Sequence, residues 1–476
     1  MNVLFAVAEM TPLAKVGGVG DVSAGLPRAL RRLGLDVRVA LPLYASIDRD
    51  AHGLSRLAAL PDGAALWEAE VRGVPTYLIE HEAAFGRELV YGYEDDPKRF
   101  LAFCDALLAA SEVLDWQPDA VHAHDWHTGF TGARLAAAAD HAWADAARIF
   151  TIHNLGYRGE FDDAFAAEHG LPAWAFAAPP GVAVEVARSG LGLGLLHAGR
   201  VSTVSPTYAR EILAPEQSDA LAPLLARLPY PVAGVLNGID TDEWDPATDE
   251  RLAARFDAER LDRRRESKRA LRERLGLADA GEAPVIGMVS RLVVQKGADL
   301  AVAAIDRLLK TSDLQLAVLG VGEETYEQAM TALAERHPGR AAVRLAFDEE
   351  LGQLIYGGSD LFLMPSRYEP CGLGQLIAMR YGAVTVVRRT GGLADTVSPY
   401  DAARDEGTGF VFDDATPDAL VAALEAALAA YRDRDGWWRL QRRAMAQDFS
   451  WGRSARNYAE LYEGAIGERS ATRGAR

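Results

Sequence analysis

The feature that most constrains the fold is a strand–loop–helix pattern that runs along the chain and then starts again. Short apolar runs, such as Asn2–Ala8 and Val285–Val289, are each followed by a loop and then by a helical stretch. Unbroken apolar runs of this length are typical of central strands in a parallel sheet. Alternating strands and helices indicate that helices cover both faces of such a sheet. We therefore predict an α/β fold with two doubly wound domains.

Each half of the chain contributes its own series of strands. The first series is expected at residues 2–8, 36–41, 76–79, 120–122, 149–152, 201–204 and 232–236, with a helix over 24–33. A charged helical stretch is expected over 251–275, and the second series follows at 285–289, 314–319, 343–346, 361–364, 384–387 and 410–412. A last helix is expected over 438–466, with a loose tail at 469–476. The predicted domains are 1–243 and 244–450, and residues 451–476 form a C-terminal segment.

Size, charge and cysteine content limit the functional classes. A chain of 476 residues is too long for one ordinary core. Its net charge of −18 argues against nonspecific binding to nucleic acid or to acidic membranes. Cys104 and Cys371 form neither a zinc spacing nor a disulfide framework, which suits a reducing cytoplasm. Because the first residues lack a signal-peptide pattern and no long charge-free apolar run is present, we expect a cytoplasmic protein without a membrane segment.

The stretch Ser366–Gly374 is the strongest candidate for a functional site. A buried strand over 361–364 precedes it, a single acid, Glu369, lies in its turn, and a helix begins near its end. Open α/β sheets bind ligands at the carboxyl ends of their strands, and helix N-termini attract phosphate. Because no histidine or acid can be paired with Cys371, we interpret this residue as a pocket-lining thiol rather than a nucleophile.

Three further loops follow strands and carry groups that suit an anionic ligand. They contain Lys15 with Gly17 and Gly18, Arg291 with Lys296, and Thr390 with Gly391. Glycine lets a ligand approach the backbone, arginine can grip a phosphate with two donors, and lysine acts as a point charge. Taken alone, the lysine loop is also explained by a tight turn with a solvated lysine, Arg291 and Lys296 by solvated surface cations, and the Thr390 turn by a turn without a ligand, so these interpretations stay open.

Histidines follow two other strands. His122 and His124 share one strand face, but no other residues complete a zinc ligand set, so we expect no metal. Asp125 is interpreted as a hydrogen-bond acceptor for a polar ligand or, alternatively, as the N-cap of the next helix. His153 is either a ligand contact or a structural histidine.

Taken in order, these motifs resemble those of the bacterial glycogen synthases, with the plant starch synthases as relatives. The resemblance covers roughly Asn2–Ile466 and includes the motifs Asn237–Asp240 and Arg389–Thr396. It implies the GT-B fold, in which two Rossmann-like domains face each other across a cleft, and a C-terminal helix that crosses back to the N-terminal domain. It also implies a retaining transfer of glucose from ADP-glucose to the non-reducing end of an α-1,4-glucan such as glycogen, without metal or cofactor.

The resemblance further implies roles for individual residues. Glu369 would face the transferred glucose, His153 would lie near its anomeric carbon, and Arg291 with Lys296 would clamp the diphosphate. The remaining nucleotide-sugar contacts would come from Lys15, Gly17, Gly18, Asp125, Asn237, Phe347, Cys371, Gly372, Leu373, Thr390 and Gly391. Phe347 stands where the family commonly has a tyrosine stacked on adenine, and it keeps the aromatic face. Val16 and Val19 replace the family's usual threonine and leucine in the lysine loop.

Other functions stay open at this level. A related GT-B transferase could use UDP-glucose or a small acceptor, because no derived feature distinguishes adenine from uracil. A phosphorylase would need a lysine that holds pyridoxal phosphate. An NAD-dependent dehydrogenase would explain the doubly wound pattern, but Ser23 stands where the Gly-x-Gly-x-x-Gly fingerprint needs its last glycine. A non-catalytic glucan-binding protein would leave Lys15, Arg291, Lys296 and Glu369 without a common purpose.

Overall fold

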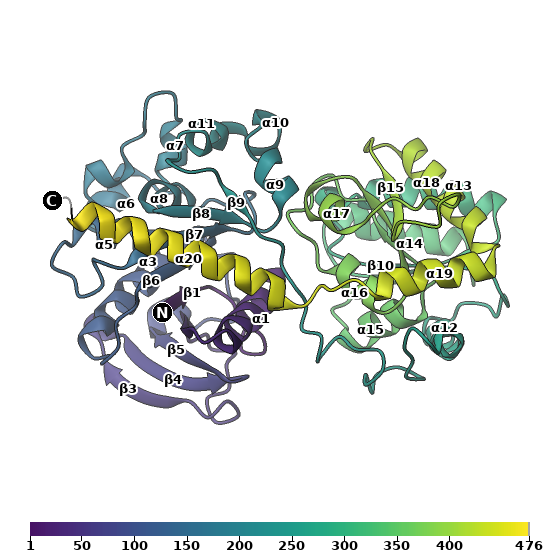
Figure 1. The fold of residues 1–476 in the computed structure, drawn as a ribbon, viewed down its shortest axis with the longest axis horizontal. Coiled ribbons are helices and arrows are strands. Elements are labelled where there is room, and N and C mark those ends of the chain that lie inside the picture. Colours follow the sequence, from purple (N-terminus) through teal and green to yellow (C-terminus); the bar gives the residue numbers. More distant parts are fainter. Residues whose placement is uncertain (475–476) are drawn as a thin grey trace. The chain divides into compact units, whose positions relative to one another are not determined.

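The computed structural model describes residues 1–474 and divides into two compact units, drawn in Figure 1. Unit 1 comprises Met1–Gly238 together with Trp451–Arg476, and unit 2 comprises Ile239–Ser450. The first unit is thus assembled from two separate parts of the chain. No helix in the described residues is long and apolar enough to cross a membrane.

Unit 1 contains a nine-stranded sheet in the order β3-β4-β5-β2-β1-β6-β7-β8-β9. The pairings from β5 to β9 are parallel, whereas β3–β4 and β4–β5 are antiparallel. The strands are β1 (Asn2–Ala6), β2 (Asp36–Pro42), β3 (Ser55–Ala59), β4 (Ala65–Val71), β5 (Val74–Glu80), β6 (Ala120–His124), β7 (Ala147–Ile152), β8 (Arg200–Thr203) and β9 (Ala233–Gly234). The sequence prediction missed β3 and β4, because β3 is largely exposed and the middle of β4 alternates half-buried and exposed residues instead of forming an apolar run.

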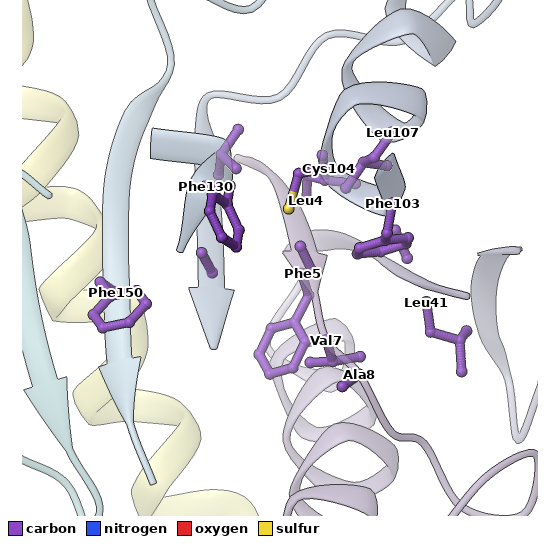
Figure 2. Packing of buried hydrophobic residues seen from close by; sticks show 14 of the residues in the cluster. Leu4, Phe5, Val7, Ala8, Leu41, Phe103, Cys104, Leu107, Phe130 and Phe150 are labelled. Atoms are coloured by element: carbon purple, nitrogen blue, oxygen red, sulfur yellow. The ribbon is translucent and has the colours of Figure 1, made fainter. Parts of the chain in front are cut away.

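The helices of unit 1 pack on this sheet and bury its apolar side chains. Figure 2 shows Leu4 and Phe5 of β1 in the same core as Phe103, Cys104 and Leu107 of α3. The helices are α1 (Gly18–Arg32), α2 (Glu82–Phe85), α3 (Asp96–Ala109), α4 (Asp125–Thr128), α5 (Phe130–Ala137), α6 (Asp163–Glu168), α7 (Val184–Ala187), α8 (Gly190–His197), α9 (Pro206–Glu211), α10 (Pro215–Ser218), α11 (Ala222–Leu225) and α20 (Trp451–Gly474). Because α1 begins at Gly18 and not at residue 24, its N-terminus lies directly behind the lysine loop.

The C-terminal helix α20 completes unit 1. In Figure 1 it runs across the strands of this unit, and it contacts α1 and β7. Its own residues Tyr458 and Tyr462 are fully buried. Trp451 packs so closely on Gly25 of α1 that a Cβ at Gly25 would lie 2.0 Å from its indole nitrogen. The helix is therefore part of the core of unit 1.

Unit 2 contains a six-stranded parallel sheet in the order β12-β11-β10-β13-β14-β15. Its strands are β10 (Val285–Val289), β11 (Gln315–Leu319), β12 (Ala341–Arg344), β13 (Leu361–Met364), β14 (Val384–Arg388) and β15 (Gly409–Phe412). Its helices are α12 (Arg264–Leu275), α13 (Ala298–Thr311), α14 (Glu324–Arg336), α15 (Glu349–Gly358), α16 (Gly374–Arg380), α17 (Gly391–Thr396), α18 (Pro417–Tyr431) and α19 (Arg434–Met445). The two units are Rossmann-like α/β domains, as predicted.

Three predicted boundaries were wrong. The charged stretch over 251–275 is helical only from the 3-10 turn at Leu261–Arg263 onward, since carboxylates such as Asp249 and Asp257 bind backbone N–H groups of the preceding turns. The helix over 438–466 is broken between α19 and α20, where Phe449 accepts a hydrogen bond from the backbone of Ile239. The tail from Arg469 remains helical to Gly474, and the last two residues lie outside the described part.

Strand order reverses once in the parallel part of each sheet. In unit 1 the strands from β2 to β5 lie on one side of β1 and those from β6 onward lie on the other, so β1 and β6 flank the reversal. In unit 2 the corresponding pair is β10 and β13. Ligands of open α/β sheets bind outside the carboxyl ends of strands at such a reversal. We therefore expect functional residues in the loops after these four strands.

Candidate active site

The reversal in unit 2 brings together a lysine and a glutamate. Nζ of Lys296, in the loop after β10, lies 2.8 and 2.6 Å from the two carboxylate oxygens of Glu369, which follows β13. The hydroxyl of Ser366 also donates to Glu369, at 2.9 Å. Glu369 is 4% exposed, so its charge is balanced by a close cation and a hydroxyl rather than by bulk water. The sequence had proposed Lys296 and Glu369 for the site without predicting that they pair.

Glycines let the loop after β14 lie directly on the Glu369 turn. A Cβ at Gly391 would come within 1.9 Å of the carbonyl oxygen of Glu369, and one at Gly392 within 2.2 Å of that of Cys371. Gly391 also has a φ of 44°, in the left-handed region that favours glycine. The amide of Gly392 donates to the carbonyl of Glu369 at 3.1 Å. Thr390 and Gly391 are thus placed beside Glu369.

A buried glutamine that the sequence reasoning missed holds this turn. The side-chain N–H group of Gln375 donates to the carbonyls of Cys371 and Gly372, each at 3.0 Å, and also reaches Thr396. Gly372 has a φ of 74°, and Cys371 is buried. Gln375 is the second residue of α16, which begins directly after Leu373. A polar residue in the first turn of a buried helix was the available signal.

Arg291, the other predicted diphosphate contact of unit 2, is held more loosely than Lys296. Arg291 is exposed, and its guanidinium contacts the side-chain oxygen of Gln295 at 3.4 Å. Gly297, directly after Lys296, has a φ of 69°, and a Cβ there would lie 2.2 Å from the carbonyl oxygen of Pro365. The loops after β10 and β13 are therefore packed together at this end of the sheet. Phe347, after β12, is 79% exposed and leaves its ring face open to solvent.

In unit 1, the loop after β1 is organised by a buried acid. One carboxylate oxygen of Glu9 accepts the amides of Val16 and Gly17 at 2.6 and 2.8 Å, and the other accepts the hydroxyl of Tyr91 at 2.9 Å. Because the amide of Gly17 is already bound, only the first-turn amides from Gly18 onward suit an anionic ligand. Gly17 stays a predicted donor-site residue, and its amide is held by Glu9. Glu9 was missed, although an acid directly after a central strand was visible in the sequence.

Lys15 lies at the surface of this loop. Its Nζ is 2.8 Å from a carboxylate oxygen of Asp21, in the first turn of α1, and the two side chains are about equally exposed. An exposed pair of this kind contributes little stability and exchanges readily with other partners. Lys15 is therefore available to an anion near the N-terminus of α1.

Asp125 and His153 meet at the carboxyl ends of β6 and β7. One carboxylate oxygen of Asp125 accepts the amides of His153 and Asn154, at 2.7 and 3.3 Å. Asp125 has a φ of 56° and does not cap α4, so the N-cap interpretation was wrong. Burial raises the pKa of Asp125 to about 7, although the two amides act in the opposite direction. The carboxylate thus positions His153 through its backbone.

The ring of His153 is held from the core side. Its Nε2 lies 2.9 Å from Nδ1 of His124, and the residue is 8% exposed. Burial lowers the pKa of His153 to about 3, so the ring is neutral at physiological pH.

Asn237, which follows β9, is 8% exposed, and its side-chain oxygen is buried without a hydrogen-bond partner in residues 1–474. Such an atom suits a ligand hydroxyl.

The strand histidines do not form a metal centre with their neighbours. His122 bonds to Tyr462 and Thr151, at 2.8 and 2.6 Å, and His124 bonds to His153. In the part of the chain that the structure describes, no three His, Cys, Asp or Glu residues are grouped so that they could hold a metal ion.

Comparisons with known proteins match both units. The starch synthase catalytic domain family matches residues 2–227, and the family of glycosyl transferases group 1 matches residues 271–439. A glycogen synthase of Syntrophotalea carbinolica is 43% identical over 98% of this chain and 99% of its own length. A glycogen synthase of Anaeromyxobacter sp. is 44% identical over 97% of this chain and 99% of its own.

Solved structures agree with these matches. The catalytic domain of starch synthase IV from Arabidopsis thaliana, bound to ADP and acarbose, has a TM-score of 0.91 and 36% identity, with coverage of 98% of this chain and 99% of that one. A sucrose-phosphate synthase from Thermosynechococcus elongatus, 18% identical with a TM-score of 0.63, covers 98% of this chain and 99% of its own and shares the fold.

Proposed function

The chain belongs to the glycogen synthase family, and from this we propose that it transfers glucose from ADP-glucose to the non-reducing end of an α-1,4-glucan. The observation that carries the proposal is the Lys296–Glu369 pair at the strand reversal of unit 2, in a chain that is similar over 98% of its length to the ADP-bound catalytic domain of a starch synthase. We further propose that the reaction retains the anomeric configuration, needs no metal or cofactor, and takes place in the cytoplasm.

The proposed role of Arg291 and Lys296 is to stabilise the leaving diphosphate. Negative charge develops on the leaving group as the glycosidic bond breaks, and a diphosphate departs as an anion without protonation. Loss of one well-placed donor to such a charge costs about 2.7–4 kcal/mol. The amides of the α1 N-terminus, from Gly18, together with Lys15 and the Thr390–Gly391 turn, are the other candidates for phosphate contacts.

The sugar is proposed to bind next to Glu369 and the backbone of Cys371, Gly372 and Leu373, with His153, Asp125 and Asn237 as further contacts. Retention through a covalent intermediate would need a carboxylate on the opposite face of the sugar. We favour front-face transfer, in which the departing phosphate helps to deprotonate the acceptor and Glu369 stabilises the positive charge that develops on the sugar. Phe347 is proposed to stack on adenine through its exposed ring.

The test is ADP release from ADP-glucose, with and without glycogen, compared with UDP release from UDP-glucose. We expect release that depends on glycogen and prefers ADP-glucose. A preference for UDP-glucose or for a small acceptor would support the related GT-B transferase instead. The variants Glu369→Ala and Arg291→Ala separate catalysis from simple glucan binding: each is expected to lose most turnover, and Glu369→Ala should still bind ADP-glucose. Normal turnover in either variant would remove that residue from the mechanism.

A further inference from the structure

A row of buried rings connects His153 to the core of unit 1. His122 and His124 lie two residues apart on β6, so both side chains project from the same face of the sheet. Their ring centroids are 3.9 Å apart, and the ring of Phe5 packs 4.0 Å from that of His124. His124 then reaches His153 through a 2.9 Å contact between Nδ1 and Nε2. Nε2 of His153, a proposed sugar contact, is therefore bonded to the buried ring of His124.

The two nitrogens of His124 have different surroundings. Nδ1 meets His153, whereas Nε2 is buried and has no hydrogen-bond partner in residues 1–474. Burial lowers the pKa of both His124 and His153, so each ring carries a single proton near neutral pH. Either ring could supply the proton of the hydrogen bond between them, and the choice fixes the tautomer of both.

The partnerless nitrogen distinguishes the two arrangements. If His153 donated, the proton of His124 would sit on Nε2, leaving a buried N–H group without an acceptor. If His124 donates from Nδ1, its Nε2 is a bare lone pair, and buried acceptors without partners are better tolerated than orphaned N–H groups. We propose that His124 donates to His153 and thereby holds His153 as the tautomer that is protonated on Nδ1.

This inference rests on the proposed function and gives His153 a defined chemical role within it. Nδ1 of His153 has no hydrogen-bond partner among the described residues, and in this tautomer it is a donor. Nucleotide sugars present oxygen acceptors, several of them anionic, so a donor matches them better than a lone pair. His124 does not itself contact the substrate in this arrangement. It acts through His153 as a positioning residue.

The direct test is a long-range proton–nitrogen correlation spectrum of the full chain, labelled with ¹⁵N at histidine, near pH 7.5 and without ligand. The signals of His153 are assigned by their loss in His153→Asn. We expect the proton of His153 on Nδ1, and a spectrum with that proton on Nε2 overturns the inference. Because this measurement needs no turnover, it stands whether or not the chain releases ADP, and an active enzyme with the other tautomer would leave the proposed function intact.

Two variants of His124 test its role. Asparagine keeps an N–H donor near the position of Nδ1, whereas phenylalanine keeps only the ring. His124→Asn should retain the Nδ1–H tautomer of His153 and turnover within about threefold, while His124→Phe should give mixed tautomers and a kcat roughly tenfold lower, with KM for ADP-glucose changed less than about threefold. An unchanged tautomer and kcat in His124→Phe would overturn the inference.

His127 provides a matched control. It belongs to the same motif, is half-buried, and has a buried ring nitrogen without a partner in the described residues, but it makes no hydrogen bond to His153. His127→Phe should therefore leave the tautomer of His153 unchanged. If His127→Phe shifts the tautomer as much as His124→Phe does, general repacking rather than donation by His124 explains the effect. If His124→Phe does not fold, the wild-type and His124→Asn spectra still decide.

Discussion

The Lys296–Glu369 pair allows the architecture of the site to be tested by a double-mutant cycle. The side chains are 17% and 5% exposed, and Nζ bonds to both carboxylate oxygens. Removal of one partner of a buried ion pair costs about 3–5 kcal/mol, because the other charge is left unpaired. Lys296 keeps some hydration, so we expect Glu369→Gln to lower the free energy of unfolding by about 3 kcal/mol. Lys296→Met leaves the more buried charge and should cost about 4 kcal/mol.

The double variant carries neither charge and should be destabilised less than the sum of the single variants. We expect a coupling energy of about 2–3 kcal/mol from urea unfolding of the four proteins, followed by circular dichroism. The matched control is Arg307–Asp418 in the same unit, which is 2.5 Å apart with side chains 53% and 85% exposed. Its coupling energy should stay below about 1 kcal/mol. Equal coupling at the two sites would refute the argument that burial gives the Lys296–Glu369 pair its strength.

The same substitution separates binding from catalysis. In Glu369→Gln the cation of Lys296 is no longer neutralised, so ADP should bind as tightly as in the wild type or severalfold more tightly. Turnover should nevertheless fall by about 10²–10³, because the carboxylate that supports the sugar cation is missing. Titration calorimetry with ADP and the ADP-release assay measure the two effects. If ADP affinity fell together with stability, Lys296 would not be a phosphate contact.

Three other predictions concern the fold around the site. Asp125→Asn should gain stability relative to the wild type as the pH rises from 5 to 8. The raised pKa of Asp125 means that the native state holds the proton of this carboxyl more tightly than the unfolded state, and this stabilisation of the wild type is present below about pH 4 and lost as the pH passes about 7. A difference in melting temperature between the two proteins that does not change with pH would contradict the shift. Gly391→Ala should cost about 2–4 kcal/mol and abolish turnover, since its Cβ would overlap the carbonyl of Glu369, and a variant with wild-type activity and melting temperature would show that this loop is free to move. Gly25→Ala should destabilise unit 1 by about 1–3 kcal/mol, because the added Cβ would overlap Trp451. The control is Gly464→Ala in α20, where an added Cβ would meet no neighbouring atom within 4 Å and should be neutral or stabilising. Equal effects of the two substitutions in thermal unfolding would argue against the close packing of α20 on α1.

The parallel strands were predictable because central strands of such sheets are long apolar runs. The run at Leu361–Met364 was predicted with its observed bounds, and the strands on either side of it were placed within a residue or two. The antiparallel strands β3 and β4 were not predicted, because many of their residues are exposed or half-buried and form no continuous apolar run. The two-residue turn between β4 and β5 consists of Arg72 and Gly73, which both adopt positive φ, and only the glycine is typical of such a turn.

The candidate site was predictable in its charged groups but not in the residues that hold them. Lys296 and Glu369 stand out because each follows a buried strand. Glu9 and Gln375 bind backbone amides and carbonyls. Their places after a strand and at a helix start were visible in the sequence, but the backbone groups that they bind depend on loop conformations that residue types do not specify. The pairing of His124 with His153 depends on the register of β6 and β7, which the apolar pattern does not specify.

The discontinuity of unit 1 has a consequence for biosynthesis. A ribosome that adds about 5–20 residues per second needs roughly 10–40 s to translate Ile239–Ser450 between the two parts of this unit. Throughout that interval His122 lacks Tyr462 and Gly25 lacks Trp451, so the face of the sheet that α20 covers stays open in the nascent chain. Of the two units, the one that starts first is therefore completed after the other, and His122 behind His153 gains its hydrogen bond to Tyr462 only after unit 2 has been translated.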